Sequence, residues 1–512
     1  MAKVLFINPV VREEDDPRHV PYGIALLAAI VVEEGHQVQV YDANAWRAGD
    51  EVLRQAIEAD DWDVIAVGGI TTAYGYIKKI VEFAKAYAPQ SRVVAGGGFL
   101  TSMPHDIMNF LPGIDIGVVG EGFATFSEIL QQMDSGTENW NAVDGVIFRD
   151  ADGNLQLTPA RNLLEDLDSL PYPAWDLFPV EEVYFKNSAA LYSEEGMLSE
   201  RRLDINASYG CSLICRYCFH LGLSGDMKYE DQGGETTVSF DTPGSYDRTI
   251  RYHSPRYVVD LVKHARERYD IDFIGFLDEN LMTMDKFSGR TWMEEICRLW
   301  IEEGLQPSCV RDGVPHDENC SGVHWGGTSH ATLATQEILT KMREAGCSHL
   351  IYGYESFSEK VMKTIGKGAT PKTNERSYRW TLEAGIRPIP NQIMGFPKED
   401  IDSLIDNMRA WDRLGIVVKP FFATPYPGSE WFTVNKERIL AQYEGDLEAF
   451  ILDLGDATKV TAVISEQFNA VELYGLRELM VNRDYKRIRE YGEKHHSTGS
   501  TQSSVVENEK AA

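Results

Sequence analysis

The feature that most constrains the fold of this chain is a regular alternation of short apolar segments with amphipathic helical segments. In the N-terminal part, strand patterns lie at 3–9, 37–43, 63–70, 92–98 and 116–122, and helical patterns lie between them at 23–35, 52–60 and 77–89. Such alternation predicts a parallel sheet covered by helices on both faces. We therefore expect residues 1–150 to form an α/β domain with a doubly wound, Rossmann-like sheet.

A ligand is expected at one edge of this first sheet. In an open parallel sheet, ligands bind beyond the carboxyl ends of the strands, and glycine there lets the backbone approach a bulky ligand closely. The candidates at these ends are Asn8, Thr71, Thr72, Gly96, Gly97, Gly98, Gly120, Glu121 and Gly122. Any one of the glycines could be a turn residue only, but four such strand ends together favour a binding face.

A second alternating series follows a segment that contains several prolines. Residues 151–200 include "SLPYPAWDLFPV", which favours an extended linker between two domains. Strand patterns recur at 201–211, 273–280, 322–331, 349–356, 386–397 and 417–428, with helical patterns among them at 256–268, 333–345 and 401–414. This repetition predicts a full or partial α/β barrel over 201–435, with its chemistry at the carboxyl ends of the strands. We expect a helical region at 436–494 and a disordered tail at 495–512.

Charge and hydropathy narrow the class of partner. The chain has 49 Lys and Arg against 79 Asp and Glu, a formal net charge of −30, which would repel nucleic-acid phosphates and anionic membranes. Its longest apolar runs fall short of the roughly 20 residues that span a bilayer, and the N-terminus lacks a signal-peptide pattern. The seven cysteines are odd in number and mostly isolated, unlike a secreted disulfide framework. We expect a cytoplasmic protein that binds neither nucleic acid nor membrane.

Three of the cysteines stand close together in "YGCSLICRYCFH", directly after the first strand of the predicted barrel. Cys211, Cys215 and Cys218 have C-x-x-x-C-x-x-C spacing with no fourth cysteine in reach. A structural zinc site needs four ligands, so that interpretation requires His220 as the fourth. Three thiolates on a 4Fe–4S cluster instead leave one iron open to bind a substrate, and the position at a barrel mouth favours this second interpretation.

This cysteine motif, placed after the first barrel strand, resembles that of the radical S-adenosylmethionine (SAM) superfamily, whose fold implies a partial (β/α)6 barrel. Tyr217 stands where that family usually has an aromatic residue, and the resemblance implies that it is part of the SAM site. Further segments are similar to the family's SAM-binding strands: "FLDENLMT", "IYGYESFSEK" and "NQIMGFPKED". The resemblance implies that Asp278 and Glu279 meet the methionine amino group, that Glu355 meets the ribose hydroxyls, and that Gly395 flanks the adenine.

The N-terminal domain is similar to the cobalamin-binding domain of one subgroup of these enzymes, the cobalamin-dependent (class B) radical SAM family. The segments that carry this similarity are "NP", "PYGIALLAAIVVEEGHQVQVYDA", "GGG" and "VVGEG". The resemblance implies three cofactors, namely a 4Fe–4S cluster, SAM and cobalamin, and an electron donor such as flavodoxin or ferredoxin. It implies a C-methyltransferase that uses a 5′-deoxyadenosyl radical and methylcobalamin on an unactivated carbon of a small molecule.

Two other functions stay open at this point. One is a cobalamin-containing radical SAM enzyme that cyclises, rearranges or oxidises its substrate without methylating it. The other is a cobalamin or iron sensor that does no chemistry, against which the complete set of predicted SAM-binding residues argues. On the expected fourth strand of the barrel, Tyr352 and Tyr354 are candidate catalytic tyrosines, because a tyrosine can return a hydrogen atom to a substrate radical.

The chain departs from the family pattern in several places. The spacing around His19 in "DDPRHVPYG" does not fit the motif of a histidine that ligates cobalt from below, so we do not expect it to be an axial ligand. His330 stands where many relatives have an arginine for the SAM carboxylate, which leaves Arg376, Lys341 or a backbone amide for that contact. Cys309, His316 and Cys320 could bind a metal, although incidental thiols in a surface loop are the simpler interpretation. The polar insertion 224–248 is expected to shape the substrate pocket.

Overall fold

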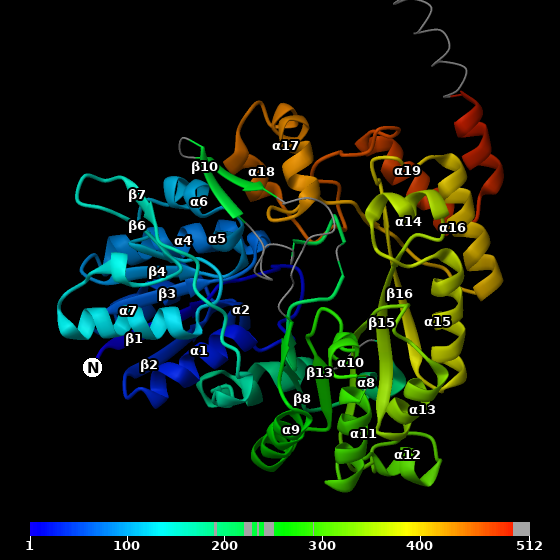
Figure 1. Ribbon diagram of the computed structural model, residues 1–512, viewed down its shortest axis with the longest axis horizontal. Coiled ribbons are helices and arrows are strands. Elements are labelled where there is room, and N and C mark those ends of the chain that lie inside the picture. The colour runs from blue at the N-terminus through cyan, green and yellow to red at the C-terminus, as the bar shows by residue number, and fades with distance from the viewer. Residues whose placement is uncertain are drawn as a thin grey trace, which may run out of the picture.

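The structure is a computed structural model that describes residues 1–188, 192–213, 215–219, 250–289 and 291–494, and the backbone of 228–232 and 235–239. Two sheets form the framework, and they stand side by side in Figure 1, the first in blue and cyan and the second in green and yellow. None of the helices in the described residues combines the length and apolarity needed to cross a membrane.

The N-terminal sheet has the strand order β2-β1-β3-β4-β5-β6-β7. The strands are β1 (Lys3–Asn8), β2 (Gln37–Asp42), β3 (Val64–Gly68), β4 (Arg92–Gly96), β5 (Ile116–Val118), β6 (Val146–Arg149) and β7 (Leu155–Leu157). The first five are parallel, whereas β6 and β7 continue the sheet antiparallel. After β1 the chain places β2 on one side of it, and it then places β3, β4 and β5 on the other side. The strand order therefore reverses at β1, and ligands of such sheets bind beside this reversal.

Helices cover both faces of this sheet, which confirms the doubly wound fold. The helices are α1 (Tyr22–Glu33), α3 (Asp50–Glu58), α4 (Tyr74–Tyr87), α5 (Gly98–Ser102), α6 (Pro104–Phe110) and α7 (Phe123–Ser135), with a short α2 (Ala43–Trp46) and a 3-10 turn, η1 (Thr71–Ala73). Helices α1 and α7 pack on one face, where Val31 and Ile129 meet Val4. Helices α3 and α4 pack on the other, where Leu53 and Ile77 meet Leu5. Because successive side chains of β1 point to opposite faces of the sheet, they pack into two separate hydrophobic cores, one on each face.

The second sheet is a parallel, six-stranded half barrel with the order β8-β13-β14-β15-β16-β17. Its strands are β8 (Arg202–Ile205), β13 (Phe273–Phe276), β14 (His324–Ser329), β15 (Cys347–Glu355), β16 (Arg387–Met394) and β17 (Phe421–Phe422). The outer helices are α9 (Pro255–Tyr269), α11 (Trp292–Glu302), α13 (Gln336–Glu344), α15 (Pro371–Glu383) and α16 (Ile401–Leu414). The partial (β/α)6 barrel is thus confirmed.

Local signals fix the ends of these helices. Helix α16 begins after Asp400, whose side chain accepts a hydrogen bond from the Ser403 amide, and it ends at Gly415 with φ +68°. An acidic N-cap and a left-handed glycine are the signals by which helices start and stop. Shorter pieces near the strand ends are α10 (Thr283–Phe287), α12 (Ser308–Asp312), α14 (Glu359–Ile365), β9 (Ser208–Tyr209) and β12 (Arg251–Tyr252).

The segment between the two sheets differs from an extended linker. The first sheet continues to Leu157, past the boundary we placed at residue 150. Beyond it, Trp175 and Tyr184 are almost completely buried and join the core that α9 and β8 share. The large aromatic side chains of this segment explain the difference, because their burial stabilises a fixed path over the barrel.

The C-terminal helices bridge the two sheets instead of forming a region of their own. They are α17 (Glu430–Gln442), α18 (Leu447–Asp453) and α19 (Ala470–Val481), so the boundary we placed at residue 435 falls inside α17. Phe432 and Phe450 join the core of the first domain beside α4, whereas α19 packs on α16 of the barrel (Figure 1). The predicted tail at 495–512 and most of the insertion 224–248 lie outside the described residues. From that insertion, β10 (Lys228–Gln232) and β11 (Glu235–Ser239) form a hairpin that reaches α6.

Candidate functional site

The loop with the three clustered thiols lies at the carboxyl end of β8, as expected. Cys215 is buried, and Cys211 and Cys218 are half-buried. The loop is anchored on separate sides: the Arg216 amide donates to the Ile365 carbonyl at 3.2 Å, and the Arg216 Nε donates to Glu430 Oε1 at 2.8 Å. The Ser212 amide donates to Thr283 Oγ1 at 3.2 Å. These contacts hold the three thiols at the carboxyl ends of the barrel strands, the barrel mouth. Ile214 and His220 of this loop lie outside the described residues.

Glu355 is the centre of a buried polar group beside these thiols. It ends β15 with φ +57°, a conformation that non-glycine residues rarely adopt outside functional or strained sites. Tyr217 Oη donates to Glu355 Oε1 at 2.8 Å, and Lys367 Nζ donates to the same oxygen at 2.6 Å. The structure therefore brings together Tyr217 and Glu355, two residues that the sequence predicted for SAM.

Lys367 is the residue of this group that sequence reasoning missed. It follows α14 and is buried, with Nζ 3.1 Å from Tyr217 Oη. Burial alone would lower the pKa of its ammonium, but the Glu355 carboxylate and the Cys215 and Cys218 thiols outweigh burial and raise that pKa. Lys367 therefore places a fixed positive charge at the barrel mouth.

The carboxyl end of β13 brings further polar groups to the same mouth. Asp278 accepts hydrogen bonds from the Ala207 amide at 3.1 Å and from the Ser208 hydroxyl, so it braces the backbone that leads to Cys211. Burial raises the pKa of the Asp278 and Glu279 carboxyls to about 7 in each case. Asp278 is thus part of the protein's own hydrogen-bond network, and the contact of Asp278 and Glu279 with the methionine amino group stays a prediction.

Unpartnered polar atoms at this mouth test whether a ligand such as SAM fits. Asn280, after β13, is buried, and neither its amide nitrogen nor its oxygen has a hydrogen-bond partner in the described part of the chain. The same holds for Asn206 Oδ1, directly after β8. A buried polar atom without a partner is costly, by about 1–3 kcal/mol. These atoms, with three thiols and Glu355 nearby, fit a polar ligand that completes their hydrogen bonds.

The structure does not bring the other predicted cations to the mouth. Lys341 on α13 forms ion pairs with Glu294 at 2.7 Å and Glu337 at 2.9 Å on the outer helices. Arg376 on α15 stacks over Trp380 at 4.8 Å. His330 lies at the end of β14, and burial lowers the pKa of its imidazole to about 3, so the ring is neutral. Lys367 is thus the cation that the described residues offer near Glu355.

Gly395 directly follows β16 with φ +91°. Its amide donates to Glu399 Oε2 at 2.6 Å. Burial raises the pKa of the Glu399 carboxyl to about 8. The left-handed turn at Gly395 favours glycine, and a Cβ there would lie 3.3 Å from the Leu473 side chain. The place of Gly395 beside the adenine stays a prediction.

The two candidate catalytic tyrosines lie on the helix side of β15. Tyr352 Oη is 2.9 Å from Thr381 Oγ1, and Tyr354 Oη accepts from Ser377 Oγ at 3.1 Å; both partners are on α15. The two rings stack with centroids 5.3 Å apart and are fully buried. The structure therefore does not group Tyr352 and Tyr354 with Glu355.

The predicted cobalamin face lies at the carboxyl ends of β1, β3, β4 and β5. Gly97 and Gly120, after β4 and β5, are exposed in left-handed conformations, with φ +95° and +85°. Gly96, Gly98 and Gly122 lie beside them, half-buried, and Thr71 and Thr72 form the turn after β3. Ile70 in that turn is 42% exposed, an apolar surface that sequence reasoning missed. Exposed glycine backbone next to an exposed large apolar side chain fits a bulky, partly apolar ligand such as cobalamin.

Two residues predicted for this face instead hold parts of the protein together. Asn8 Nδ2 donates to Asp42 Oδ1 at 2.7 Å, and Tyr184 Oη donates to the other oxygen of Asp42 at 2.6 Å. Glu121 Oε2 is 2.7 Å from Arg251 of β12, with both side chains about one-tenth exposed. Asn8 therefore holds the Asp42 carboxylate that fixes the linker to the first domain, and Glu121 fixes the first domain to the barrel.

Contacts between the two domains place their ligand edges close to each other. His19 Nδ1 lies 2.7 Å from Asp204 Oδ2 of β8, so its ring is directed toward the barrel. A Cβ on Gly428 would lie 3.0 Å from Ser102 Oγ of α5 and 3.4 Å from the carbonyl oxygen of Phe219 in the cysteine loop. The turn between β17 and α17, helix α5 and the thiol loop therefore lie close together.

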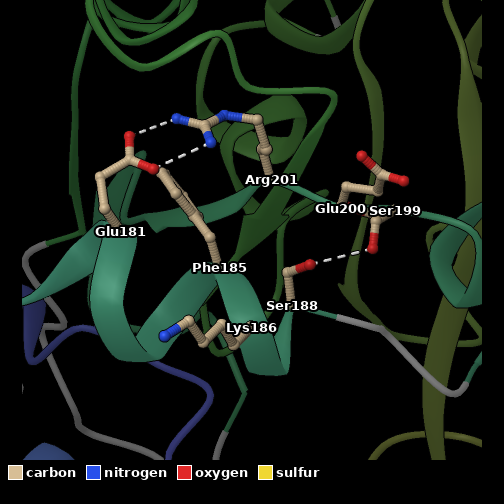
Figure 2. Close-up of a pocket in the computed structure, with 7 residues that line it drawn as sticks. All are labelled: Glu181, Phe185, Lys186, Ser188, Ser199, Glu200 and Arg201. Carbon is tan, nitrogen blue, oxygen red and sulfur yellow. Dashed lines mark hydrogen bonds and ion pairs between the residues drawn. The ribbon is translucent and has the colours of Figure 1, made fainter.

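A hollow on the surface lies away from this site. Figure 2 shows that it is lined by residues of the linker and of the segment before β8, including Phe185, Ser188 and Arg201. Its volume is about 430 Å³. Glu181 and Arg201, which form an ion pair, both line it. Because it lies at the amino end of β8, this hollow is separate from the barrel mouth.

Comparisons with known proteins agree with this geometry. The B12 binding domain family matches residues 9–130, and the radical SAM superfamily matches residues 205–410. An uncharacterized methyltransferase of Pyrococcus horikoshii is 25% identical over 410 residues, which cover 80% of this chain and 77% of that protein. Cytidylyl-2-hydroxyethylphosphonate methyltransferase of Streptomyces wedmorensis is 24% identical over 84% of this chain and 80% of its own.

A relative with another activity and two solved structures extend the comparison. Anaerobic magnesium-protoporphyrin IX monomethyl ester cyclase of Rubrivivax gelatinosus is 23% identical over 84% of this chain and 69% of its own. The radical SAM methyltransferase TsrM of Kitasatospora setae superposes with a TM-score of 0.62 at 16% identity, over 86% of this chain and 77% of TsrM. The cobalamin-dependent radical SAM enzyme OxsB superposes with a TM-score of 0.60 at 16% identity, and the chain spans 56% of its length.

The two family matches coincide with the two sheets of the structure. The first contains the strand ends with exposed glycine backbone, and the second begins at β8 and contains the three clustered thiols and Glu355. The predicted fold and the predicted pair of cofactor-binding domains are confirmed. The chain belongs to the cobalamin-dependent radical S-adenosylmethionine enzymes, which use a 4Fe–4S cluster, SAM and cobalamin.

Proposed function

We propose that this enzyme transfers a methyl group to an unactivated carbon of a small-molecule substrate. The observation that carries the proposal is the meeting of the two ligand edges, where Gly428, Ser102 of α5 and Phe219 of the cysteine loop lie in contact. A methyl donor held by the first domain would then lie next to a radical generated in the barrel. Relatives and a similar structure with methyltransferase activity in their names support the same reaction class.

Each part of the chain has a role in this proposal. When bound, the cluster with SAM supplies hydrogen-atom abstraction, and cobalamin supplies the methyl group. Cys211, Cys215 and Cys218 would hold the cluster through three thiolates, which leaves one iron for SAM. Glu355 would accept the ribose hydroxyls of SAM, and Gly395 would flank the adenine.

Lys367 and Tyr217 position Glu355 for that contact. Both donate to Glu355 Oε1, so this oxygen is fixed while the other stays available to a ligand hydroxyl. Glu279 and the unpartnered amide of Asn280 are candidates for the methionine end of SAM. The first domain and the bridging helices α17 and α18 would keep water from the reacting atoms, which radical chemistry requires.

Partners and compartment follow from the same reaction. The substrate would be a small molecule, and a one-electron donor of the flavodoxin or ferredoxin class would reduce the cluster. None of the seven cysteines, all of which the structure describes, forms a disulfide. Free thiols and an oxygen-sensitive cluster support a reducing, cytoplasmic environment.

A second candidate function is cyclisation or oxidation of a substrate without methyl transfer, which the cyclase relative favours. One anaerobic assay separates the two. Protein reconstituted with iron, sulfide and cobalamin is incubated with a reductant, candidate substrates and SAM that carries a trideuterated methyl group. Methyl transfer predicts 5′-deoxyadenosine, S-adenosylhomocysteine and a trideuterated product. Formation of 5′-deoxyadenosine with an altered substrate but without S-adenosylhomocysteine would contradict methyl transfer.

A further inference from the structure

A second group of metal-binding side chains lies far from the barrel mouth. Cys309, His316, Cys320 and His324 each direct one ligand atom to a common point, and these four atoms all lie within 4.8 Å of one another. From the sequence, Cys309, His316 and Cys320 are possible metal ligands, with incidental thiols in a surface loop as the simpler interpretation. The structure adds His324 and shows that Cys309 and His324 are both buried.

The distances within this group match those of a tetrahedral site. Cys309 Sγ lies 3.4 Å from His324 Nε2 and 3.6 Å from His316 Nδ1. Cys320 Sγ lies 3.9 Å from His324 Nε2. A sulfur at ~2.3 Å and a nitrogen at ~2.0 Å from one zinc ion, at the tetrahedral angle, are about 3.5 Å apart. The ligand atoms therefore already have close to the separations that an ion would impose.

Neighbouring groups prepare these side chains to ligate. The other ring nitrogen of His324, Nδ1, is 3.2 Å from the Gly346 carbonyl oxygen. A carbonyl can only accept, so Nδ1 carries the proton and the lone pair of Nε2 faces the thiols. Cys320 Sγ accepts from the Cys309 amide at 3.3 Å and from the Ser308 hydroxyl at 3.7 Å. Donors of this kind stabilise a thiolate and orient metal ligands.

The backbone around the group is closed and tight. The Ser308 amide donates to the Ser321 carbonyl at 2.7 Å, and the Val323 amide donates to the Leu305 carbonyl at 2.8 Å. Gly322 has φ +103°, and a Cβ there would lie 2.6 Å from the Gln306 carbonyl oxygen, so only glycine fits this crossing. These contacts bring Cys309, on α12, and Cys320 to the start of β14.

The position of the group excludes a part in the radical chemistry. His324 is the first residue of β14, whereas the reaction site lies beyond the carboxyl ends of the strands. At ~3.3 Å per residue, the six residues of β14 separate the two by roughly 16 Å. In Figure 1, α12 lies at the lower edge of the barrel, and α14, which carries the chain to Lys367, lies at the upper edge. Features at the amino ends of barrel strands serve stability.

We propose that Cys309, His316, Cys320 and His324 bind one structural zinc ion that fastens the 305–324 loop to the barrel. Two thiolates and two imidazoles form a closed, four-ligand set, which is typical of structural zinc. The two thiolates neutralise the ion, so the site places no net charge against the buried start of β14. The proposal does not depend on the reaction that the barrel catalyses.

Metal analysis of the full-length protein, purified anaerobically from zinc-supplemented medium, tests this site. We expect one zinc per chain, and at least a tenfold lower zinc content in Cys309→Ala and Cys320→Ala. Two controls are matched to these variants. Cys297→Ala removes a buried thiol outside the group and should keep its zinc, and Cys211→Ala should lose iron but keep zinc.

Cobalt substitution keeps the test decisive if the alanine variants do not fold. Wild-type protein freed of cobalamin and zinc should take up Co²⁺ with the visible absorption of a tetrahedral, thiolate-bound ion, and added zinc should abolish it. Three results would overturn the proposal. They are wild-type protein without zinc, folded Cys309→Ala and Cys320→Ala variants that keep zinc, and a disulfide between Cys309 and Cys320 in protein kept under reducing conditions.

Discussion

Replacing Lys367 with Met tests how far the buried Glu355 carboxylate depends on its cation. Lys367 Nζ lies 2.6 Å from Glu355 Oε1, and both side chains are less than one-tenth exposed. Removal of one partner of a buried ion pair typically costs about 3–5 kcal/mol, because the other charge stays buried and unpaired. Tyr217 still donates to the same oxygen. We therefore expect Lys367→Met to cost about 3 kcal/mol, the lower end of that range.

This cost should appear in the local stability of β15, which ends at Glu355. Hydrogen exchange of the peptide 347–355, followed by mass spectrometry, reports the free energy of local opening. A loss of about 3 kcal/mol corresponds to exchange roughly 100-fold faster, because ~1.4 kcal/mol is a factor of ten. The affinity for SAM, measured by calorimetry, should fall as well, since Glu355 loses one of the two donors that hold its Oε1 in place.

Two control variants separate charge from packing in this prediction. Lys367→Arg keeps the positive charge and should slow β15 exchange back toward the wild-type rate. The double variant Glu355→Gln/Lys367→Met removes both charges and should recover most of the lost stability. The reasoning is refuted if Lys367→Met exchanges within about threefold of the wild type, or if the double variant loses the sum of both single changes.

Three further predictions test other parts of the structure. Burial raises the pKa of Glu399 to about 8, whereas an unfolded glutamate titrates near 4.5, so the stability that the protonated Glu399 contributes should be lost as the pH rises between these two values. Glu399→Gln should therefore flatten the decline in Tm over this range, and an unchanged slope would count against a protonated Glu399. Arg251→Met breaks the buried ion pair with Glu121, so proteolysis of the 151–200 segment should become faster, and Glu121→Gln/Arg251→Met should restore much of the resistance to proteolysis. Equal cleavage of the wild type and Arg251→Met would show that the ion pair does not hold the domains together. Tyr354→Phe should keep SAM cleavage and product formation, because Tyr354 Oη contacts Ser377 on the helix side of β15. Loss of activity in a folded Tyr354→Phe variant would make this tyrosine a catalytic residue.

Much of the fold follows from periodicity because parallel strands joined by helices leave a strong pattern. The predicted helix at 401–414 coincides with α16, whose Asp400 and Gly415 caps are readable in the sequence. The strand pattern at 417–428 was too long, since β17 covers only Phe421–Phe422. Pro420, Pro425 and Pro427 surround it, and proline cannot donate a ladder hydrogen bond. The short strands β6 and β7 were missed because few residues carry their pattern.

The site was predictable where a local motif carries the chemistry. The spacing of Cys211, Cys215 and Cys218 and the segment around Glu355 identify the barrel mouth from sequence alone. Lys367 has no such motif, and it reaches Glu355 only because α14 turns the chain back. Glu121 stands in a glycine-rich strand end that predicts a ligand, yet its partner, Arg251, comes from the other domain. Contacts between distant segments of this kind depend on domain packing, which periodicity does not encode.

The central claim is that two separate domains bind the cofactors of one reaction, and a single cysteine substitution tests it directly. Iron, cobalamin and 5′-deoxyadenosine are measured together in reconstituted wild-type protein, in Cys215→Ala and in the control Cys297→Ala. We predict that Cys215→Ala loses the iron–sulfur absorbance and SAM cleavage but binds cobalamin as the wild type does, and that Cys297→Ala keeps all three. SAM cleavage by Cys215→Ala, or loss of cobalamin from that folded variant, would contradict the claim.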